Sequence, residues 1–191
     1  GVYTQNKVKG APIAVCKEHL KDGYAQTVIV NSGIANTCNA DGIEKAKGMA
    51  HIAAKALGIE DEDVLVGSTG VIGQPLPLEP VQMHIDELFH SLSSDPEGGL
   101  RFEEGIMTTD TLPKQVAVEF PLGGKSCRIG GCAKGSGMIH PNMATMLCYL
   151  TTDVSITPEL LQTALKRVVD DTFNMVSVDG DTSTNDTCII M

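Results

Sequence analysis

The sequence is poor in aromatic residues and in positive charge. Its 191 residues include no Trp, three Tyr and four Phe, and 14 Lys and Arg against 24 Asp and Glu give a net charge of −10. The basic residues form no stripe, which disfavours binding to nucleic acid, because nucleic-acid phosphates are held mainly by Lys and Arg. Binding to an anionic membrane surface is disfavoured for the same reason.

Long apolar runs and targeting segments are also missing. No apolar run reaches the roughly 18 residues of a membrane-spanning helix, and the first residues lack the pattern of a signal peptide. We therefore expect no membrane partner and a location in the cytoplasm, or in the mitochondrial matrix if the organism is eukaryotic. Because the chain begins with Gly1 instead of Met and reads as a strand from the start, we expect that an N-terminal piece is missing.

Sequence patterns for metal binding are absent as well. The six Cys residues contain no C-x-x-C pair, and the five His residues form neither an H-E-x-x-H motif nor a cluster. A zinc site would need such spacing. We therefore expect free buried thiols in a reducing compartment and no bound metal.

The sequence does contain an alternation of predicted strands and helices. Asp41 is expected to cap a helix that runs to about Leu57, because the apolar residues of this stretch recur at helical spacing and Gly58 follows as a C-terminal cap. Residues 81–92 predict a second helix, and the polar stretch 93–99 that follows is expected to be a loop.

Two adjacent glycines, Gly123 and Gly124, lie between two predicted strands and indicate a β-hairpin. Thr157 and Pro158 predict the start of a third helix, with an N-cap residue followed by Pro at the first helical position. Hairpins mixed with helices favour a layered α+β fold over a purely parallel sheet. The last predicted strand stops at Met191, which indicates a truncated larger domain. Strands are predicted at 26–30, 64–66, 115–120, 126–129, 146–150, 175–178 and 188–191.

The stretch from Lys134 to Leu147 is the most unusual part of the sequence. A glycine-rich turn leads through Pro141 to Ala144 and Thr145, and then directly into an apolar strand. If the bond between Ala144 and Thr145 is cut, Thr145 gains an α-amino group with a pKa of about 7.7–8.0. That amine can accept the proton of the Thr145 hydroxyl, so that one residue serves as nucleophile and base. On pattern alone, however, a Thr that opens a strand is usually structural.

Two other features could serve such a nucleophile. The G-S-T-G turn at 67–70 follows a predicted strand, and Thr69 and Gly70 could direct a hydroxyl and a backbone N–H at a developing oxyanion. Phosphate binding is the rival interpretation, but neither G-x-x-x-x-G-K-[ST] nor G-x-G-x-x-G is present, and an ordinary tight turn stays open. Lys134 could hold a substrate carboxylate, or it could be an ordinary surface Lys.

Two polar stretches are ambiguous when taken alone. The M-T-T-D-T stretch at 107–111, which includes Thr108, could bind the polar head of an amino acid or could form a turn. The D-G-D-T-S-T-N-D stretch at 179–186 fails the EF-hand pattern, because its Gly is misplaced and the Glu is missing. We predict that it is a hydrogen-bonded loop that joins two strands beside the active site.

Together these stretches resemble the ornithine acetyltransferase (glutamate N-acetyltransferase) family over nearly the whole chain. Each segment alone is a weak signal, but six in the same order are highly specific. The segments are N-S-G at 31–33 with A-N at 35–36, G-S-T-G at 67–70, M-T-T-D-T at 107–111, K-G-S-G-M at 134–138, P-N-M-A-T-M-L at 141–147 and D-G-D-T-S-T-N-D at 179–186.

The resemblance implies a precursor that cuts itself between Ala144 and Thr145. Thr145 would then take an acetyl group from N2-acetyl-L-ornithine as an ester and pass it to L-glutamate, in a ping-pong reaction of arginine biosynthesis. Some family members also accept acetyl-CoA as the donor, and no metal or organic cofactor is implied. Thr69 and Gly70 would form the oxyanion hole. The implied substrate contacts are Thr108, Lys134 and Thr145.

The same resemblance implies a fold and an assembly. The family fold is an α+β sandwich of sheets flanked by helices, so residues 1–191 would be a single partial catalytic domain. Residues 1–144 would be most of an α chain, and residues 145–191 would be the start of a β chain. The cleaved chains would associate further, and we expect a heterotetramer.

The resemblance has two departures and leaves two alternatives open. Ile34 and Asn39 stand where family members often have Asn and Thr. Members also continue well past Met191, and the missing part supplies further groups to the substrate pocket, so we do not expect this chain to be active alone. The alternatives are a related self-processing Thr hydrolase, such as an aminopeptidase, and an inactive fragment or degenerate copy.

Overall fold

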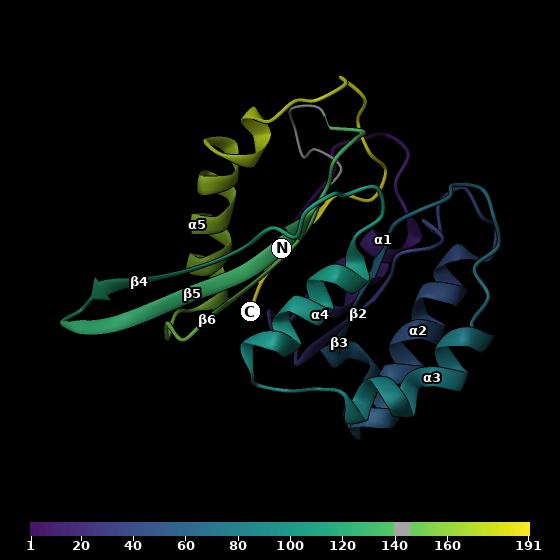
Figure 1. Ribbon diagram of the computed structural model, residues 1–191, viewed down its shortest axis with the longest axis horizontal. Coiled ribbons are helices and arrows are strands. Elements are labelled where there is room, and N and C mark those ends of the chain that lie inside the picture. Colours follow the sequence, from purple (N-terminus) through teal and green to yellow (C-terminus); the bar gives the residue numbers. More distant parts are fainter. Residues whose placement is uncertain (140–145) are drawn as a thin grey trace.

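Two β-sheets organise the computed structural model, which describes residues 1–139 and 146–191 (Figure 1). The strands are β1 (Val2–Tyr3), β2 (Thr27–Asn31), β3 (Val64–Ser68), β4 (Gln115–Leu122), β5 (Lys125–Lys134), β6 (Leu147–Thr152) and β7 (Thr187–Ile190). The larger sheet has the order β1-β7-β6-β5-β4, with antiparallel neighbours except for the parallel pair β6 and β7. The smaller sheet is the parallel pair β2 and β3.

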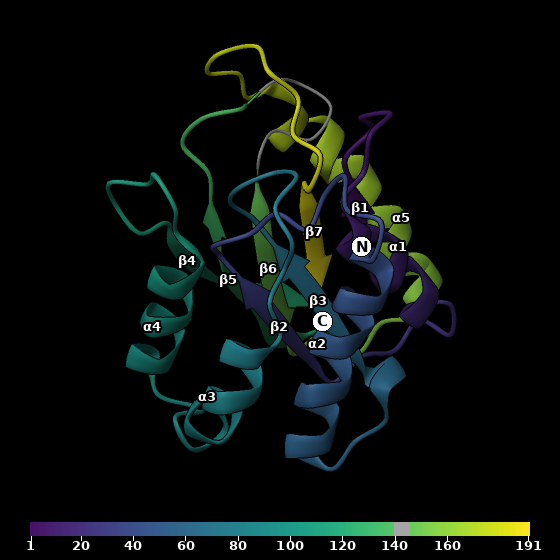
Figure 2. The same cartoon turned by 90° about the vertical axis from the view of Figure 1, so that its right-hand side faces the viewer.

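Helices flank the larger sheet on both sides. They are α1 (Ala11–His19), α2 (Gly42–Leu57), α3 (Glu79–His90), α4 (Pro96–Ile106) and α5 (Pro158–Asp170), with the short 3-10 helices η1 (Asp61–Asp63) and η2 (Phe173–Met175). Figures 1 and 2 show α5 on one side of the larger sheet, and the smaller sheet with α1 to α4 on the other. This arrangement confirms the predicted α+β fold of sheets flanked by helices.

Alternation along β6 explains why the larger sheet is covered on both faces. Leu147 and Tyr149 pack into the main core together with α1, α2 and β3. Cys148, between them, packs with Leu165 and Val169 of α5. Successive side chains of a strand point to opposite faces, so this apolar strand buries side chains on both sides.

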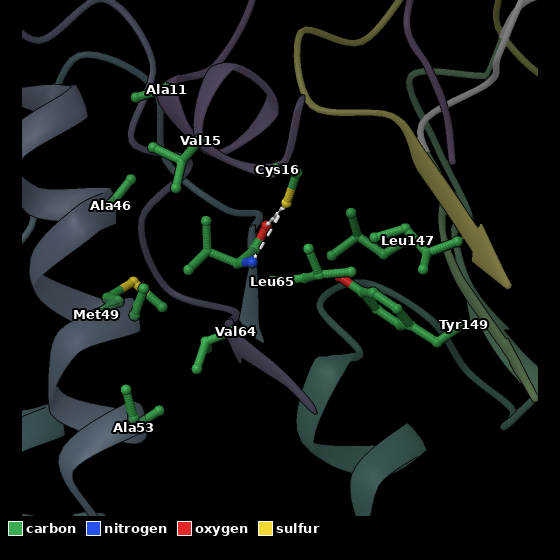
Figure 3. Close-up of a cluster of buried hydrophobic side chains, with 14 of the residues drawn as sticks. Ala11, Val15, Cys16, Ala46, Met49, Ala53, Val64, Leu65, Leu147 and Tyr149 are labelled. Atoms are coloured by element: carbon green, nitrogen blue, oxygen red, sulfur yellow. Dashed lines mark hydrogen bonds between the residues drawn. The ribbon is translucent and has the colours of Figure 1, made fainter. Parts of the chain in front are cut away.

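The main core fixes β3 between the helices and the larger sheet (Figure 3). All five residues of β3 are buried. The α2 face toward this core carries small side chains, among them Ala46 and Ala53, which permit close approach. The Cys16 thiol of α1 donates to the Val66 carbonyl at 3.1 Å and accepts the Val66 N–H at 3.3 Å. The turn that follows β3 therefore starts from a rigid strand.

Local sequence signals predicted several of these elements correctly. The predicted α2 is present, with Asp41 at its N-cap position but without a capping hydrogen bond from the Asp41 side chain. Gly58 follows α2 in the left-handed region at φ 69°. Gly123 and Gly124 connect β4 to β5 with φ values of 59° and 78°. The Thr157 hydroxyl caps α5 by accepting the Leu160 N–H at 3.4 Å. Each of these features depends on residues that are close in the sequence.

Other predictions about local structure were wrong. The strand predicted at 175–178 is absent, since η2 ends at Met175 and no strand follows before β7 in the described chain. The segment instead bonds to a loop, with the Val178 N–H donating to the Ile139 carbonyl at 2.9 Å. The loop predicted at 93–99 contains the start of α4, whose Ile106 is buried in the main core. Tertiary packing overrode the low helix propensity of its glycines.

Candidate active site

A cavity of about 200 Å³ opens where β3 and β5 end and β7 begins. It brings together four residues that the sequence analysis singled out, Thr69, Gly70, Thr108 and Lys134. Its wall is completed mainly by residues that follow Lys134 and by residues 183–185. Because β2 and β3 are parallel, the loops after their carboxyl ends meet at one edge of the sheet. These four of the predicted site residues therefore lie at one cavity.

The turn after β3 offers two hydrogen-bond donors to this cavity. The Thr69 backbone N–H is used, because it donates to the Asn31 carbonyl at 3.0 Å. The Thr69 hydroxyl and the Gly70 N–H have no partner within residues 1–139 and 146–191, and both residues line the cavity. Donors arranged in this way can stabilise a negatively charged oxygen.

Gly70 adopts a backbone conformation that only glycine tolerates well. Its φ is 120°, and a Cβ at this position would overlap the Gly33 carbonyl group. The Val71 N–H donates to the Gly33 carbonyl at 3.1 Å, and the Ala35 N–H donates to the Val71 carbonyl at 2.8 Å. The two loops that follow β2 and β3 are thereby held against each other, and the direction of the Gly70 N–H is fixed.

Lys134 ends β5 and supplies a buried positive charge to the cavity. Lys134 is 3% exposed, and its ammonium donates to the Thr108 hydroxyl at 2.9 Å. Burial lowers the pKa of Lys134, and the negative charge of Asp110, together with that of Asp186 when it is ionised, acts in the opposite direction. No ion pair of Lys134 is present in the described part of the chain. The surface interpretation of Lys134 is therefore wrong, and its remaining donors can bind an anionic ligand group.

Asp110 anchors the stretch at 107–111 to the turn that follows Lys134. Its carboxylate accepts the Lys114 ammonium at 2.6 Å, the Gly135 N–H at 2.7 Å and the Thr108 N–H at 3.3 Å. Burial alone would raise the pKa of Asp110, but these hydrogen bonds outweigh it and the pKa is lowered. This anchoring role was not predicted from the sequence, although Asp is a common partner of nearby backbone N–H groups.

Asn185 is a second residue of the site that the sequence analysis did not single out. Its amide donates to the carbonyls of Ala35 at 2.6 Å and Ser68 at 2.8 Å, and its oxygen accepts the Thr37 and Thr184 hydroxyls, each at 2.6 Å. The loop 179–186 lies beside the site as predicted, but it connects η2 to β7 instead of joining two strands. Its polar composition was the only available signal.

The two departures from the family pattern contribute to the loop structure. Ile34 forms an isolated parallel bridge with Val71. The Asn39 amide donates to the Gln74 carbonyl at 2.6 Å. Neither residue is among those that line the cavity.

The predicted nucleophile Thr145 and its neighbour Ala144 lie outside the described residues. The chain is described again from Met146, which is 7% exposed and whose N–H donates to the Asp186 carboxylate at 3.1 Å. Leu147, the first residue of β6, is the register partner of Lys134. The start of β6 therefore lies beside the strand end that carries the buried ammonium.

Metal-binding clusters and membrane-spanning helices are both absent from the described residues. Within 1–139 and 146–191, no three His, Cys, Asp or Glu side chains are grouped so that they could hold a metal ion. No helix in the same residues combines the length and the apolar character needed to cross a membrane.

Known proteins resemble this chain over its whole length. It is 53% identical over 191 residues to the arginine biosynthesis bifunctional protein ArgJ of Caldanaerobacter subterraneus subsp. tengcongensis. The matched region covers all of this chain and 47% of that protein. It is 45% identical over 194 residues to the glutamate N-acetyltransferase of Methanocaldococcus jannaschii, with 100% of this chain and 48% of the relative covered. The chain thus spans about half the length of the curated relatives that it matches.

Two crystal structures share the fold. That of the arginine biosynthesis bifunctional protein ArgJ from Bacillus halodurans has 43% identity and a TM-score of 0.70, with 75% of each chain covered. That of the ornithine acetyltransferase from Mycobacterium tuberculosis, complexed with ornithine, has 31% identity and a TM-score of 0.66, with 77% of this chain and 76% of that chain covered. The ArgJ family matches residues 1–191, and the chain belongs to this family.

Proposed function

We propose that this chain forms part of an ornithine acetyltransferase, which moves an acetyl group from N2-acetyl-L-ornithine to L-glutamate in arginine biosynthesis. One observation carries the proposal: the Thr69 hydroxyl and the Gly70 N–H, which have no partner among the described residues, line the same cavity as the buried ammonium of Lys134. Such a cavity can bind a reacting carbonyl oxygen and a carboxylate at once. The names of the relatives, and the ornithine bound in the mycobacterial one, support the same reaction.

In the proposed reaction, the Thr145 hydroxyl oxygen attacks the acetyl carbon of acetylornithine, and the amide C–N bond breaks. The ornithine amine leaves with the proton that the Thr145 hydroxyl gave to its own α-amino group, and the acetyl group stays on Thr145 as an ester. The glutamate amine then attacks the ester carbon, the C–O bond to Thr145 breaks, and a proton from the amine passes to the Thr145 oxygen, which releases N-acetylglutamate. Thr69 and Gly70 would donate hydrogen bonds to the carbonyl oxygen in both steps.

Self-cleavage between Ala144 and Thr145 would create this nucleophile. The Thr145 hydroxyl would attack the Ala144 carbonyl carbon, the peptide C–N bond would break to give an ester and a free amine, and water would hydrolyse the ester. Residues 1–144 would then belong to an α chain and residues 145–191 to a β chain. We expect the two chains to remain together in a heterotetramer.

Lys134 is the proposed partner of the substrate α-carboxylate. Its ammonium is buried and bonded to Thr108, and its other N–H groups, which have no partner in the part of the chain that the structure describes, could bind a ligand. A buried cation without an anionic partner is costly, and a bound carboxylate would offset that cost. Thr108 would share in this contact. Acetyl-CoA is a second candidate donor, and the cytoplasm, or the mitochondrial matrix of a eukaryote, is the expected compartment.

The test uses the full-length protein. Intact-mass measurement should give an α chain that ends at Ala144 and a β chain that begins at Thr145. After incubation with acetylornithine, the β chain should carry an acetyl adduct. Thr145→Ala should abolish both, while Thr163→Ala, on the exposed face of α5, should change neither. If acetylornithine loses its acetyl group equally fast with and without glutamate, the chain belongs instead to the alternative, a self-processing Thr hydrolase. Unchanged processing and transfer in Thr145→Ala would rule the proposal out.

A further inference from the structure

One short loop contacts the chain on both sides of the predicted cleavage position. The loop runs from Val176 to Asp186, between η2 and β7, and carries an Asp at 179 and another at 186. Asp179 bonds to the chain before residue 140, and Asp186 bonds to the chain after residue 145. Two carboxylates of a single loop therefore hold the two flanks of the stretch that contains Ala144 and Thr145.

The upstream flank is held by Asp179. Its two carboxylate oxygens accept the Met138 N–H at 2.6 Å and the Ile139 N–H at 2.9 Å. The Val178 N–H donates back to the Ile139 carbonyl at 2.9 Å. The hydrogen bond from the Met138 N–H is the leading cause that lowers the pKa of Asp179. Charge-assisted bonds of this kind are stronger than neutral ones, so Ile139 is fixed against the loop.

The downstream flank is held by Asp186. This residue is fully buried, and its Oδ1 accepts the Met146 N–H at 3.1 Å. The next residue, Thr187, donates its backbone N–H to the Met146 carbonyl at 2.9 Å. Met146 follows Thr145 directly, so the bond to Asp186 involves the peptide group that joins these two residues.

The same loop also holds the donor turn of the cavity. Asn185 precedes Asp186 and donates to the Ser68 carbonyl at 2.8 Å, directly before Thr69 and Gly70. Consecutive loop residues thus bind the oxyanion turn and the strand that follows Thr145. When reacting groups are held in position in this way, less orientational freedom is lost on reaching the transition state, and the reaction is faster.

We infer that Asp179 and Asp186 are positioning residues for self-cleavage and for the nucleophile that it creates, because they hold Ile139 and Met146, the described residues on either side of the stretch that contains the Ala144–Thr145 bond. The inference rests on the proposed function, since it presupposes cleavage at that bond. After cleavage, Asp186 would keep Met146, and with it the new N-terminal Thr145, attached to the loop. Asp179 would hold the end of the α chain near Ile139.

A matched pair of variants in the full-length protein tests the downstream contact. Asp186→Asn retains an oxygen that can accept the Met146 N–H, whereas Asp186→Leu has nearly the same shape but no acceptor. Processing is followed by intact mass after cell-free synthesis of the precursor. We expect cleavage at least about tenfold slower in Asp186→Leu, with most of the rate restored in Asp186→Asn. If Asp186 had only a structural role, Asp186→Asn and Asp186→Leu would be cleaved at equal rates whenever their melting temperatures are equal.

Exposed loop residues provide a test that does not depend on a buried substitution. Asp179→Ala should also slow cleavage, whereas Asp181→Ala removes the same charge from the same loop without a side-chain contact in the described residues. Wild-type rates in Asp179→Ala and in both Asp186 variants would overturn the inference. If the wild-type precursor is not cleaved, or if Thr145→Ala is, the proposed function itself fails. The inference would also be overturned if Asp186→Leu is cleaved slowly, Asp186→Asn is cleaved just as slowly, and Asp179→Ala is cleaved at the wild-type rate.

Discussion

The side-chain amide of Asn185 donates to the backbone carbonyl of Ser68 at 2.8 Å, across 117 residues of sequence. Its second amide hydrogen bonds to Ala35, 150 residues away, at 2.6 Å. Ala35 lies in the loop that follows β2 and Ser68 is the last residue of β3, so one side chain joins both to the loop before β7. The geometry of the cavity therefore depends on Asn185, whose side-chain amide is already bonded to the protein backbone.

Replacement of Asn185 by Ala should destabilise the protein and disturb the site. The variant removes the Asn185 amide donor from the buried carbonyls of Ala35 and Ser68, and each such loss costs about 1–3 kcal/mol. We expect the free energy of unfolding to fall by about 3 kcal/mol, measured by urea denaturation of the full-length protein. Asn39→Ala, which removes one bond to Gln74 at an exposed position, is the control and should cost about 1 kcal/mol or less. Equal losses in the two variants would contradict this prediction.

Sequence reasoning succeeded where the determinants are local. Gly58 after α2, the glycine pair between β4 and β5, and the Thr157 cap each involve residues within a few positions of one another. Thr69, Gly70, Thr108 and Lys134 were assigned to one site because the order of the segments resembles a known family, and the structure brings them to one cavity.

What the sequence could not predict depends on contacts between distant segments. Nothing near Asn185 indicates that its partners are Ala35 and Ser68. The helix α4 contains Gly98, Gly99 and Gly105, so its local propensity is poor, and the burial of Ile106 in the main core stabilises it. The segment at 175–178 has a strand-like composition but bonds to Ile139 instead of to a sheet edge.

Replacement of Lys134 by Met should weaken activity without loss of stability. Met fills a similar volume but carries no charge, so a substrate carboxylate would lose a charge-assisted partner worth about 1.5–3 kcal/mol. We expect kcat/KM for acetylornithine to fall about 10- to 100-fold in the full-length enzyme. Burial lowers the pKa of Lys134, so the folded state disfavours its charge, and removal of that charge should leave the melting temperature equal or higher. An unchanged kcat/KM would exclude Lys134 as a substrate contact.

Asp186 should make stability depend on pH in a predictable direction. Burial raises the pKa of Asp186 to about 8, although the Met146 N–H and the charge of Lys134 oppose the shift. The folded state therefore holds this proton more tightly than the unfolded state, whose Asp titrates at about 3.9. The resulting stabilisation is complete below that lower pKa and is lost as the pH rises through about 8.

Asp186→Asn isolates this contribution because the amide does not titrate. The melting temperature of the variant should exceed that of the wild type by a margin that grows between about pH 5 and about pH 8. Differential scanning calorimetry of both full-length proteins across this range provides the measurement. Titrating groups that do not interact with Asp186, such as the buried Glu103, are common to both proteins and cancel in the difference, so the margin reports Asp186 together with its interaction with Lys134. A margin that is constant with pH would show that Asp186 is already ionised in the folded protein.

Gly70 and Gly73 provide a matched test of the proposed oxyanion donor. Both have positive φ, 120° and 80°, but a Cβ would overlap the Gly33 carbonyl at Gly70 and meets no atom within 4 Å at Gly73. Alanine at Gly70 must therefore displace the turn and its N–H, whereas alanine at Gly73 carries only the local backbone cost of about 1 kcal/mol. We expect kcat for acetyl transfer to fall by about 100-fold or more in Gly70→Ala. It should stay within about threefold of wild type in Gly73→Ala, because a position with free space around its Cβ leaves the turn in place. Similar kcat values for the two folded variants would mean that the Gly70 N–H is not a donor to the reacting oxygen.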